Sequence, residues 1–246
     1  GTASTMQIMA EALGLALPGT ALMPATSPDL LDFAREAGRQ AVRIAQMENM
    51  RPSDIVTMDS FENAILVHAA ISGSTNCLLH IPAIAHEFGI EITGDTFDRL
   101  HRNARYLLDV RPAGRWPAEC FYYAGGVPAI MEEIKDHLHL DVMTVTGKTV
   151  GENIADAVNK NPEVIRPVDH PYSKTGGLAV LKGNLAPDGG VVKRSAVVEE
   201  MMVHEGPARV FDCEEDAIAA IKGGKIVEGD VVVIRYEGPK GGPGMR

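Results

Sequence analysis

The chain has 246 residues, 33 of them acidic and 23 basic, which gives a formal net charge of −10. This length is enough for one large or two ordinary domains with real cores. A mean hydropathy of −0.01 and the absence of any apolar run near the roughly 20 residues of a bilayer span argue against a membrane protein. The acidic balance argues against a nucleic-acid or anionic-membrane surface, because such surfaces need clustered Lys and Arg. Three widely spaced cysteines predict a reducing cytoplasm rather than a disulfide framework.

The first part of the sequence carries mainly helical patterns. Ser27 and Pro28 favour a helix start, with Ser at the N-cap and Pro at the first helical position. Residues 142–145 fit either a short buried strand or the start of a helix. Apolar spacing predicts helices over residues 5–14, 27–48, about 60–70, 77–88, 95–107, 127–138 and 150–158.

Three prolines in residues 159–171 mark a change of character, and we place a domain boundary at residue 160. Beyond it the patterns are mainly those of strands, and four consecutive β-branched residues at 231–234 give the strongest one. The predicted strands cover residues 178–181, 191–193, 208–211 and 230–235, and one short helix covers 214–222. The pattern predicts helix-rich α/β structure over 1–160, followed by a β domain over 161–246.

Both ends of the chain have the character of internal segments. The sequence opens on Gly1 without an initiator Met, and it stops in a Gly/Pro-rich loop at Arg246. Such loops usually connect two elements. We therefore expect an internal piece of a longer protein.

The segment from Ser72 to Asn76 combines small residues and hydroxyls just before a predicted helix. Free N–H groups and the helix dipole favour an anion there, such as a substrate carboxylate or phosphate. The alternative is an ordinary helix cap. Cys77 follows at the helix start, where a thiol pKa is lowered. His80, one turn on, either reaches a ligand or is a core histidine bonded to backbone.

Glu237 directly follows the strongest predicted strand and precedes a Gly/Pro-rich loop. Carboxylates in such places are good ligands for Mg²⁺, which prefers oxygen and uses one or two protein carboxylates. A surface Glu in a turn is the alternative. No cysteine pair has the close spacing of zinc or many iron–sulfur sites.

Five segments, in order along the chain, resemble the family of dihydroxy-acid and sugar-acid dehydratases, which includes the 6-phosphogluconate and aldonate dehydratases. They are residues 1–6, 73–76 with His80, 124–126, 181–189 and 234–245. The family members are more than twice as long, so the resemblance covers their central part. It implies an α/β cluster-binding domain, of which 1–160 is the C-terminal part. It also implies a β-barrel-like domain, of which 161–246 is the N-terminal part.

The resemblance implies removal of water from a 2,3-dihydroxy carboxylate to give a 2-keto-3-deoxy acid. It also implies two cofactors, an iron–sulfur cluster, [2Fe–2S] rather than [4Fe–4S], and Mg²⁺. In this chemistry two positive centres stabilise the departing hydroxyl and the charge that develops beside the carboxylate.

The resemblance carries over residue by residue only in part. Glu237 matches the family's C-terminal Mg²⁺ ligand, and Thr2 and Ser4 lie beside the cluster loop. Ser74, Thr75 and His80 are candidates for lining the substrate pocket. The cluster cysteines are expected before Gly1 and the base serine after Arg246, so no catalytic residue or cluster ligand is assigned in this chain. Ser72 departs from the family, which usually has Gly there.

Residues 121–126 resemble the sugar-acid members, which favours an aldonate substrate. The alternatives are a dihydroxy-acid dehydratase of branched-chain amino-acid biosynthesis, or a non-catalytic binding module if the termini are natural. The resemblance also implies a homodimer or homotetramer that binds a small hydroxy acid, but neither nucleic acid nor membrane. We expect the isolated 246-residue chain to be inactive and to bind no cluster.

Overall fold

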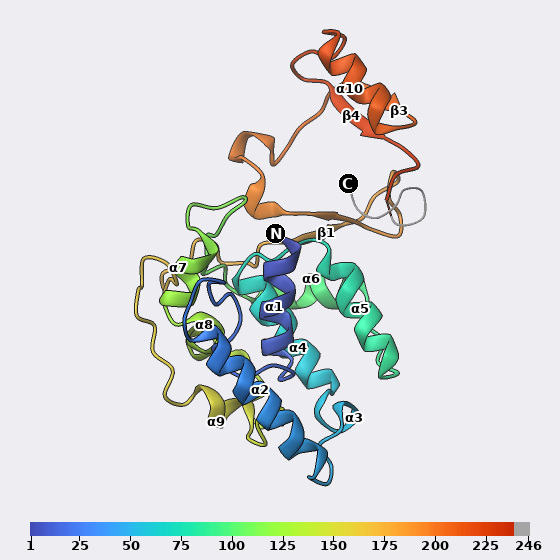
Figure 1. The fold of residues 1–246 in the computed structure, drawn as a ribbon. Helices are drawn as coiled ribbons and strands as arrows, with labels where there is room; N and C mark the ends of the chain where they lie inside the picture. Colours follow the sequence, from blue (N-terminus) through green and yellow to red (C-terminus); the bar gives the residue numbers. More distant parts are fainter. Residues whose placement is uncertain (239–246) are drawn as a thin grey trace. The chain divides into compact units, whose positions relative to one another are not determined.

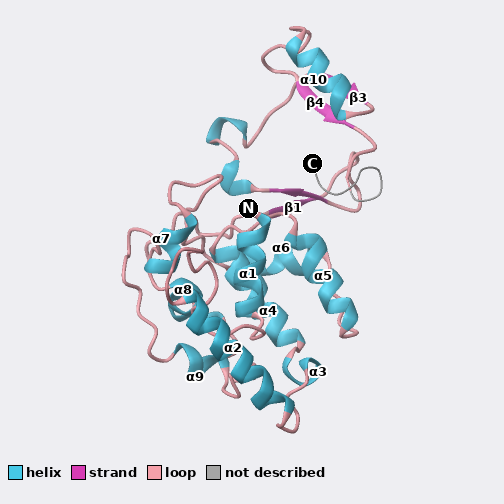
Figure 2. Ribbon diagram, in the orientation of Figure 1, coloured by secondary structure: helices cyan, strands magenta, loops and turns pink. Residues whose placement is uncertain are grey.

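A computed structural model describes residues 1–238 of the chain (Figures 1 and 2). The chain folds into two compact units, Gly1–Ala196 and Val197–Arg246. Within residues 1–238, no helix combines the length and apolar character needed to cross a membrane. Each unit is described by itself.

The first unit is built mainly of helices, with one small hairpin near its end. Its helices and strands are α1 (Thr2–Ala12), α2 (Leu30–Ala45), α3 (Pro52–Ile55), α4 (Met58–Ala70), α5 (Cys77–Glu87), α6 (Gly94–Asn103), α7 (Ala118–Tyr123), α8 (Gly126–Glu133), η1 (Lys135–His137), α9 (Val150–Ile154), β1 (Ala179–Leu181), β2 (Gly190–Val192) and η2 (Arg194–Ala196).

Helix α4 is the centre of this unit and packs against α1, α6 and α8. Its start is fixed by a capping box, in which the Ser60 N–H bonds the Thr57 hydroxyl and the Thr57 N–H bonds the Ser60 hydroxyl. Ten of its thirteen residues are buried. Such burial on all sides is typical of a central core helix.

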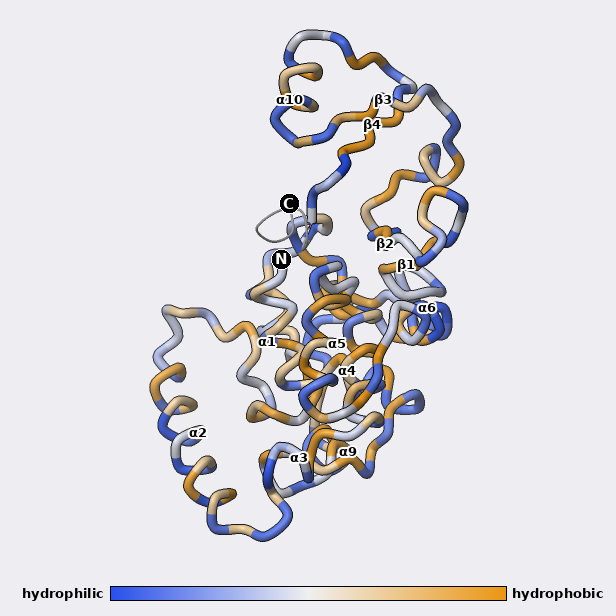
Figure 3. Tube along the Cα trace, turned by 90° about the vertical axis from the view of Figure 1, so that its right-hand side faces the viewer, coloured by the Kyte–Doolittle hydropathy of each residue, from blue (hydrophilic) through white to orange (hydrophobic). Residues whose placement is uncertain are grey.

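Helix α2 differs from its neighbours because only Gln40 of its sixteen residues is buried. Figure 3 shows hydrophobic and hydrophilic residues alternating along its trace, the pattern of an amphipathic helix. The predicted helices at residues 5–14, 27–48, 60–70 and 77–88 correspond to α1, α2, α4 and α5, with ends shifted by a few residues.

Strands β1 and β2 form an antiparallel hairpin in which Val180 pairs with Val191. The Val180 N–H donates to Asp98 Oδ1 on α6 at 3.1 Å, which ties the hairpin to the helical core. Residues 182–189 connect the two strands, and Gly189 has the positive φ of +108° that a turn glycine accepts.

The second unit contains η3 (Glu199–Met201), β3 (Ala208–Phe211), α10 (Glu214–Lys222) and β4 (Val231–Ile234). Strands β3 and β4 are parallel, with Ala208 opposite Val231 and Phe211 opposite Ile234. Helix α10 is the crossover that a parallel pair requires. Its bounds are those that the sequence predicts.

The predicted mixture of helix and sheet is confirmed, but the balance differs from the expected one. Residues 1–160 hold helices and only isolated β-bridges, and one such bridge joins Met143 to Thr149 where a strand or helix start was predicted. Among residues 1–238, the sheets are two separate two-stranded pairs. They form no barrel, because a barrel needs every strand edge to be paired. The boundary predicted at residue 160 stays a prediction.

Candidate functional site

A first cavity, of about 200 Å³ and lined by hydroxyl-bearing, cationic and apolar side chains, lies between the start of α1 and the loop that joins α4 to α5. Three of the residues predicted from sequence, Ser4, Ser74 and Thr75, line it together. Thr2 is next to it, and its hydroxyl lies 3.0 Å from Ser74 Oγ. The full lining is Gly1, Ser4, Thr5, Ile8, Leu22, Ile71, Ser72, Gly73, Ser74, Thr75, Val110, Arg111, Pro112, Ala118 and Lys193.

The loop from Ser72 to Thr75 follows from a sharp end to α4. Ser72 has φ +47°, in the left-handed region that costs an L residue free energy. At Gly73, a β-carbon would lie 2.3 Å from His68 Cδ2, so no larger residue fits without a shift. The chain can thus turn back over α4 and present Ser74 and Thr75 to the cavity.

Ser72 uses its hydroxyl, the group that distinguishes it from glycine. Its Oγ lies 2.5 Å from Ser195 Oγ, and its carbonyl oxygen accepts a hydrogen bond from Lys193 Nζ at 2.9 Å. The residue is buried. The hydroxyl therefore ties the loop to the segment that follows β2, a contact that glycine could not make.

Two buried imidazoles, those of His68 and His101, are hydrogen-bonded to each other and to the loop. His68 Nδ1 lies 3.1 Å from His101 Nε2, and His68 Nε2 lies 3.0 Å from the carbonyl oxygen of Ser74. The Leu178 N–H donates to His101 Nδ1 at 3.2 Å. Because a carbonyl only accepts and an N–H only donates, the chain of bonds assigns the Nε2–H tautomer to both rings.

Both rings are neutral in this arrangement. Burial lowers the pKa of His68 to about 4. Burial also lowers the pKa of His101 well below its usual value, and repulsion from a protonated His68 lowers it further. A neutral His68 donates one directed hydrogen bond to the Ser74 carbonyl. The pair therefore positions Ser74 and adds no charge to the site.

His80 lies outside this group of residues. It is on α5 and exposed to solvent. It does not line the cavity, and it is not a core histidine either. The structure therefore does not bring His80 together with Ser74 and Thr75.

Glu237 belongs to the second unit and follows β4. Its Oε1 accepts a hydrogen bond from the Glu214 N–H at the start of α10, at 3.3 Å. Within residues 1–238, no three His, Cys, Asp or Glu side chains gather as they would around a metal ion. Glu237 offers one oxygen ligand, but the described residues do not fit a complete Mg²⁺ site.

The three cysteines are free. Cys77 is buried with its Sγ 3.6 Å from Met6 Sδ, and Cys120 lies on α7. Cys213 lies in the second unit. The prediction of a lowered thiol pKa at Cys77 is wrong, because burial raises that pKa to about 12.

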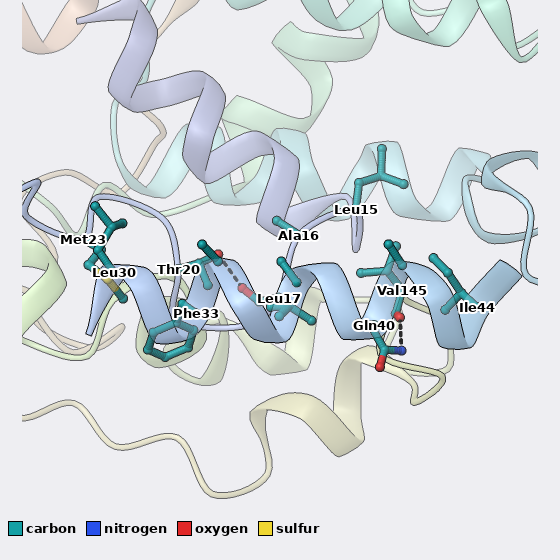
Figure 4. A pocket seen from close by; sticks show the side chains of 13 residues that line it. Leu15, Ala16, Leu17, Thr20, Met23, Leu30, Phe33, Gln40, Ile44 and Val145 are labelled. Carbon is teal, nitrogen blue, oxygen red and sulfur yellow. Dashed lines mark hydrogen bonds between the residues drawn. The ribbon is translucent and has the colours of Figure 1, made fainter. Parts of the chain in front are cut away.

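A second cavity, of about 400 Å³, lies between α2 and the loop after α1 (Figure 4). Its lining is mainly apolar, with Leu15, Leu30 and Phe33 among the side chains. Gln40 Nε2 donates to the Val145 carbonyl oxygen at 2.7 Å. None of the residues that line it is charged. It suits an apolar group rather than a hydroxy acid.

The chain matches known proteins along its whole length. Residues 1–153 match the model of the dihydroxy-acid/6-phosphogluconate dehydratase N-terminal region, and residues 163–246 match that of the C-terminal region. The chain belongs to the dihydroxy-acid/6-phosphogluconate dehydratase family. The resemblance seen in the sequence is thereby confirmed.

Three of the most similar relatives are all named dihydroxy-acid dehydratase. The chain is 60% identical over 247 residues to a dihydroxy-acid dehydratase of Agathobacter rectalis, a match that covers 100% of this chain and 44% of that protein. It is 54% identical to one of Lachnoclostridium phytofermentans, with the same coverage, and 53% identical to one of Caldicellulosiruptor bescii, of which it covers 45%. The chain thus spans less than half the length of these relatives. Their names favour the branched-chain alternative over the sugar-acid interpretation.

Sequence patterns did not single out four residues at or beside the first cavity. They are Lys193, Arg111, His68 and His101. A lysine directly after two strand valines was the available signal for Lys193. The histidines carried no local signal, because their pairing joins two helices 33 residues apart in sequence.

Proposed function

We propose that the protein containing this chain is a hydro-lyase that removes water from a 2,3-dihydroxy carboxylate with a branched carbon chain. The C2 proton and the C3 hydroxyl leave together as water, and the resulting enol tautomerises to a 2-keto acid. The observation that carries this proposal is the match of the whole chain to proteins named dihydroxy-acid dehydratase. We place the reaction in branched-chain amino-acid biosynthesis, in the cytoplasm, in a homodimer or homotetramer.

The charges and hydroxyls of the first cavity support the substrate class independently. Its lining contains two cationic residues, Lys193 and Arg111, and several hydroxyls, but none of the residues that line it is Asp or Glu. The chain as a whole carries ten more negative than positive charges, so the charge of this cavity is opposite in sign to that of the chain. Such a lining favours a small anion that carries hydroxyl groups. We assign Ser4, Ser74 and Thr75 to this pocket, with Thr2 beside it.

We also propose that the protein uses an iron–sulfur cluster of the [2Fe–2S] type and Mg²⁺, with Glu237 as one magnesium ligand. The described residues do not complete either site, so we assign no reaction step to them through these groups. What these residues supply is binding and positioning. The His68–His101 pair holds Ser74 in place, and Ser74 and Thr75 face the bound acid.

A chimera tests the proposal. In the Agathobacter rectalis dihydroxy-acid dehydratase, the matched 247 residues are replaced by this chain. We expect the chimera to form 2-keto-3-methylbutanoate from 2,3-dihydroxy-3-methylbutanoate, with a kcat/KM at least roughly tenfold above those for arabinonate and xylonate, a difference of about 1.4 kcal/mol. The 246-residue chain alone is the control and should show no turnover.

Two results would contradict the proposal. Preference for the aldonates would return the protein to the sugar-acid members that residues 121–126 resemble. A folded chimera that carries its cluster and dehydrates none of these acids would instead favour the non-catalytic binding module.

A further inference from the structure

Lys193 is a cation that lines the first cavity. It directly follows β2, and its Nζ donates one hydrogen bond to the Ser72 carbonyl oxygen at 2.9 Å. Within residues 1–238, no carboxylate forms an ion pair with it, whereas Lys182 in the same hairpin is paired with Asp95 at 2.6 Å. An ammonium group has three N–H donors. Two donors of Lys193 are therefore left for a ligand.

The surroundings of Lys193 make its charge costly without an anion. The side chain is half-buried, and burial lowers the pKa of the ammonium group from its usual value. The other cation of the cavity, Arg111, is exposed. A carboxylate in the cavity would restore to Lys193 the interaction that it loses with water.

The hydroxyls of Ser4 and Thr75 line the same cavity as Lys193 and suit the hydroxyl groups of a hydroxy acid. In the part of the chain that the structure describes, the side chains of Ser4 and Thr75 make no hydrogen bond, although both line the cavity. A hydroxyl can both donate and accept. The two can thus bond the hydroxyl groups of a ligand whose carboxylate contacts Lys193. The cavity volume of about 200 Å³ suits a small acid rather than a large ligand.

The tie between Lys193 and Ser72 is not needed to hold the loop. Two residues later, the Ser195 hydroxyl makes its own 2.5 Å contact with Ser72 Oγ. The neighbouring Arg194 bonds Ser173 and Thr175 at 3.0 and 2.7 Å. The segment therefore stays attached when the ammonium group is removed, and Lys193 is available for another role.

We propose that Lys193 binds the carboxylate of the substrate, while Ser4 and Thr75 bond its hydroxyl groups. The identity of the acid rests on the proposed function, but the preference for a carboxylate rests on the cavity alone. Lys193 is then a binding and specificity residue rather than a catalytic one.

The test compares an acid with its uncharged amide in two proteins. The probes are 2,3-dihydroxy-3-methylbutanoate and its primary amide, and their dissociation constants are measured by calorimetry in the 246-residue chain and in the metal-free chimera. We expect Lys193→Met to weaken binding of the acid by roughly 10- to 100-fold, the loss of one hydrogen bond to a charged group. Binding of the amide should change by less than about twofold, and Lys193→Arg should keep part of the preference for the acid.

Lys182→Met is the matched control, because it removes a cation of the same hairpin that is paired with Asp95 and does not line the cavity. It should leave both dissociation constants unchanged. Thermal unfolding shows whether each variant is folded. If the 246-residue chain is not folded, the dissociation constants are taken from the chimera. Equal weakening of acid and amide in Lys193→Met, or no weakening of the acid, would overturn the assignment.

Turnover separates this assignment from the proposed function. If the chimera dehydrates the acid but Lys193→Met leaves the preference for the acid intact, the assignment of Lys193 fails alone. If the chimera shows no turnover and the preference for the acid still depends on Lys193, the proposed function fails and the carboxylate site remains.

Discussion

The two compact units differ in how they are stabilised. In Gly1–Ala196, large side chains such as Phe61, Phe97 and Phe121 are fully buried in one continuous core. In the described part of Val197–Arg246, the buried apolar residues are Ala217 and Ala220. Because hydrophobic stabilisation follows the apolar area removed from water, the first unit gains far more of it.

The second unit depends on other interactions. Its parallel strands are joined by backbone hydrogen bonds, and two ion pairs connect their ends, Arg209 with Asp230 at 3.1 Å and Arg235 with Asp212 at 2.6 Å. Both side chains of the Arg235–Asp212 pair are at least half exposed, and such pairs stabilise little. Parallel strands usually have both faces covered, but Val210 is 50% exposed here. The comparison shows that secondary structure can be well formed where a core is not.

The largest expected effect is the difference in unfolding free energy between a truncation in the core of the first unit and one in a strand of the second. Phe61→Ala removes a fully buried ring and should lower the free energy of unfolding by about 3–5 kcal/mol. Val232→Ala shortens a side chain of β4 that is 38% exposed and should cost less than about 1 kcal/mol. Urea unfolding of both variants measures the difference. Similar costs would mean that the two units are stabilised alike.

The second prediction tests close packing at the loop of the candidate site. Gly73→Ala places a methyl group 2.3 Å from His68 Cδ2, and overpacking of this kind costs about 1–3 kcal/mol. Gly38→Ala in α2 is the control, because nothing lies within 4 Å of its β-carbon position. It should stabilise the protein by up to about 1 kcal/mol through helix propensity. Thermal unfolding of both variants decides, and a harmless Gly73→Ala would show that the loop is not tightly packed.

The sequence predicts the helices and strands of this protein well because local signals determine them. The four β-branched residues at 231–234 predict β4, and the helix predicted over 214–222 is α10, which Gly223 directly follows. The pairing of strands is not a local property. The barrel-like domain was expected from the family resemblance alone, and the described residues contain two separate two-stranded pairs.

The candidate site shows the same limit. Ser4, Ser74 and Thr75 could be selected because they belong to short motifs, and the structure brings them together. Lys193 reaches Ser72 across 121 residues of sequence, and no motif marks that contact. His80 shows the converse, because proximity in sequence to Ser74 did not place it at the cavity.

The third prediction concerns acid, and it involves buried groups of the first unit. His68 has a pKa of about 4 in the folded state, below the usual 6.5. Between these values the unfolded chain binds a proton that the folded chain does not. The free energy of unfolding should therefore fall as the pH drops from 6.5 toward 4, by up to about 1.4 kcal/mol per pH unit for each such histidine.

Glu11 acts in the opposite direction. Burial raises its pKa to about 7, although the Gly19 and Ala21 N–H groups that bond its carboxylate partly offset this. Between pH 7 and 4.5 the folded state holds the extra proton, so Glu11 favours folding in acid. Glu11→Gln should steepen the fall in stability with acid, measured by urea unfolding at several pH values. Gly38→Ala, which changes no titratable group, should not change the slope. An unchanged slope in Glu11→Gln would contradict the assignment.

The smallest expected effect concerns Ser72, where two contributions oppose each other. Ser72→Gly relieves the left-handed φ of +47°, worth about 1 kcal/mol, but it loses the hydroxyl contact with Ser195, also worth about 1 kcal/mol. The single variant should therefore unfold at nearly the same urea concentration as the original chain.

Ser195→Ala separates these two contributions. It removes the hydrogen bond and keeps the strain, so it should lower the free energy of unfolding by about 1 kcal/mol. Adding Ser72→Gly to Ser195→Ala should then raise stability by about 1 kcal/mol, because no hydrogen bond is left to lose. If the double variant is no more stable than Ser195→Ala, Ser72 is not strained, and its departure from glycine has no energetic cost. If it is more stable, the hydrogen bond between Ser72 and Ser195 offsets the backbone strain of a serine at a position that favours glycine.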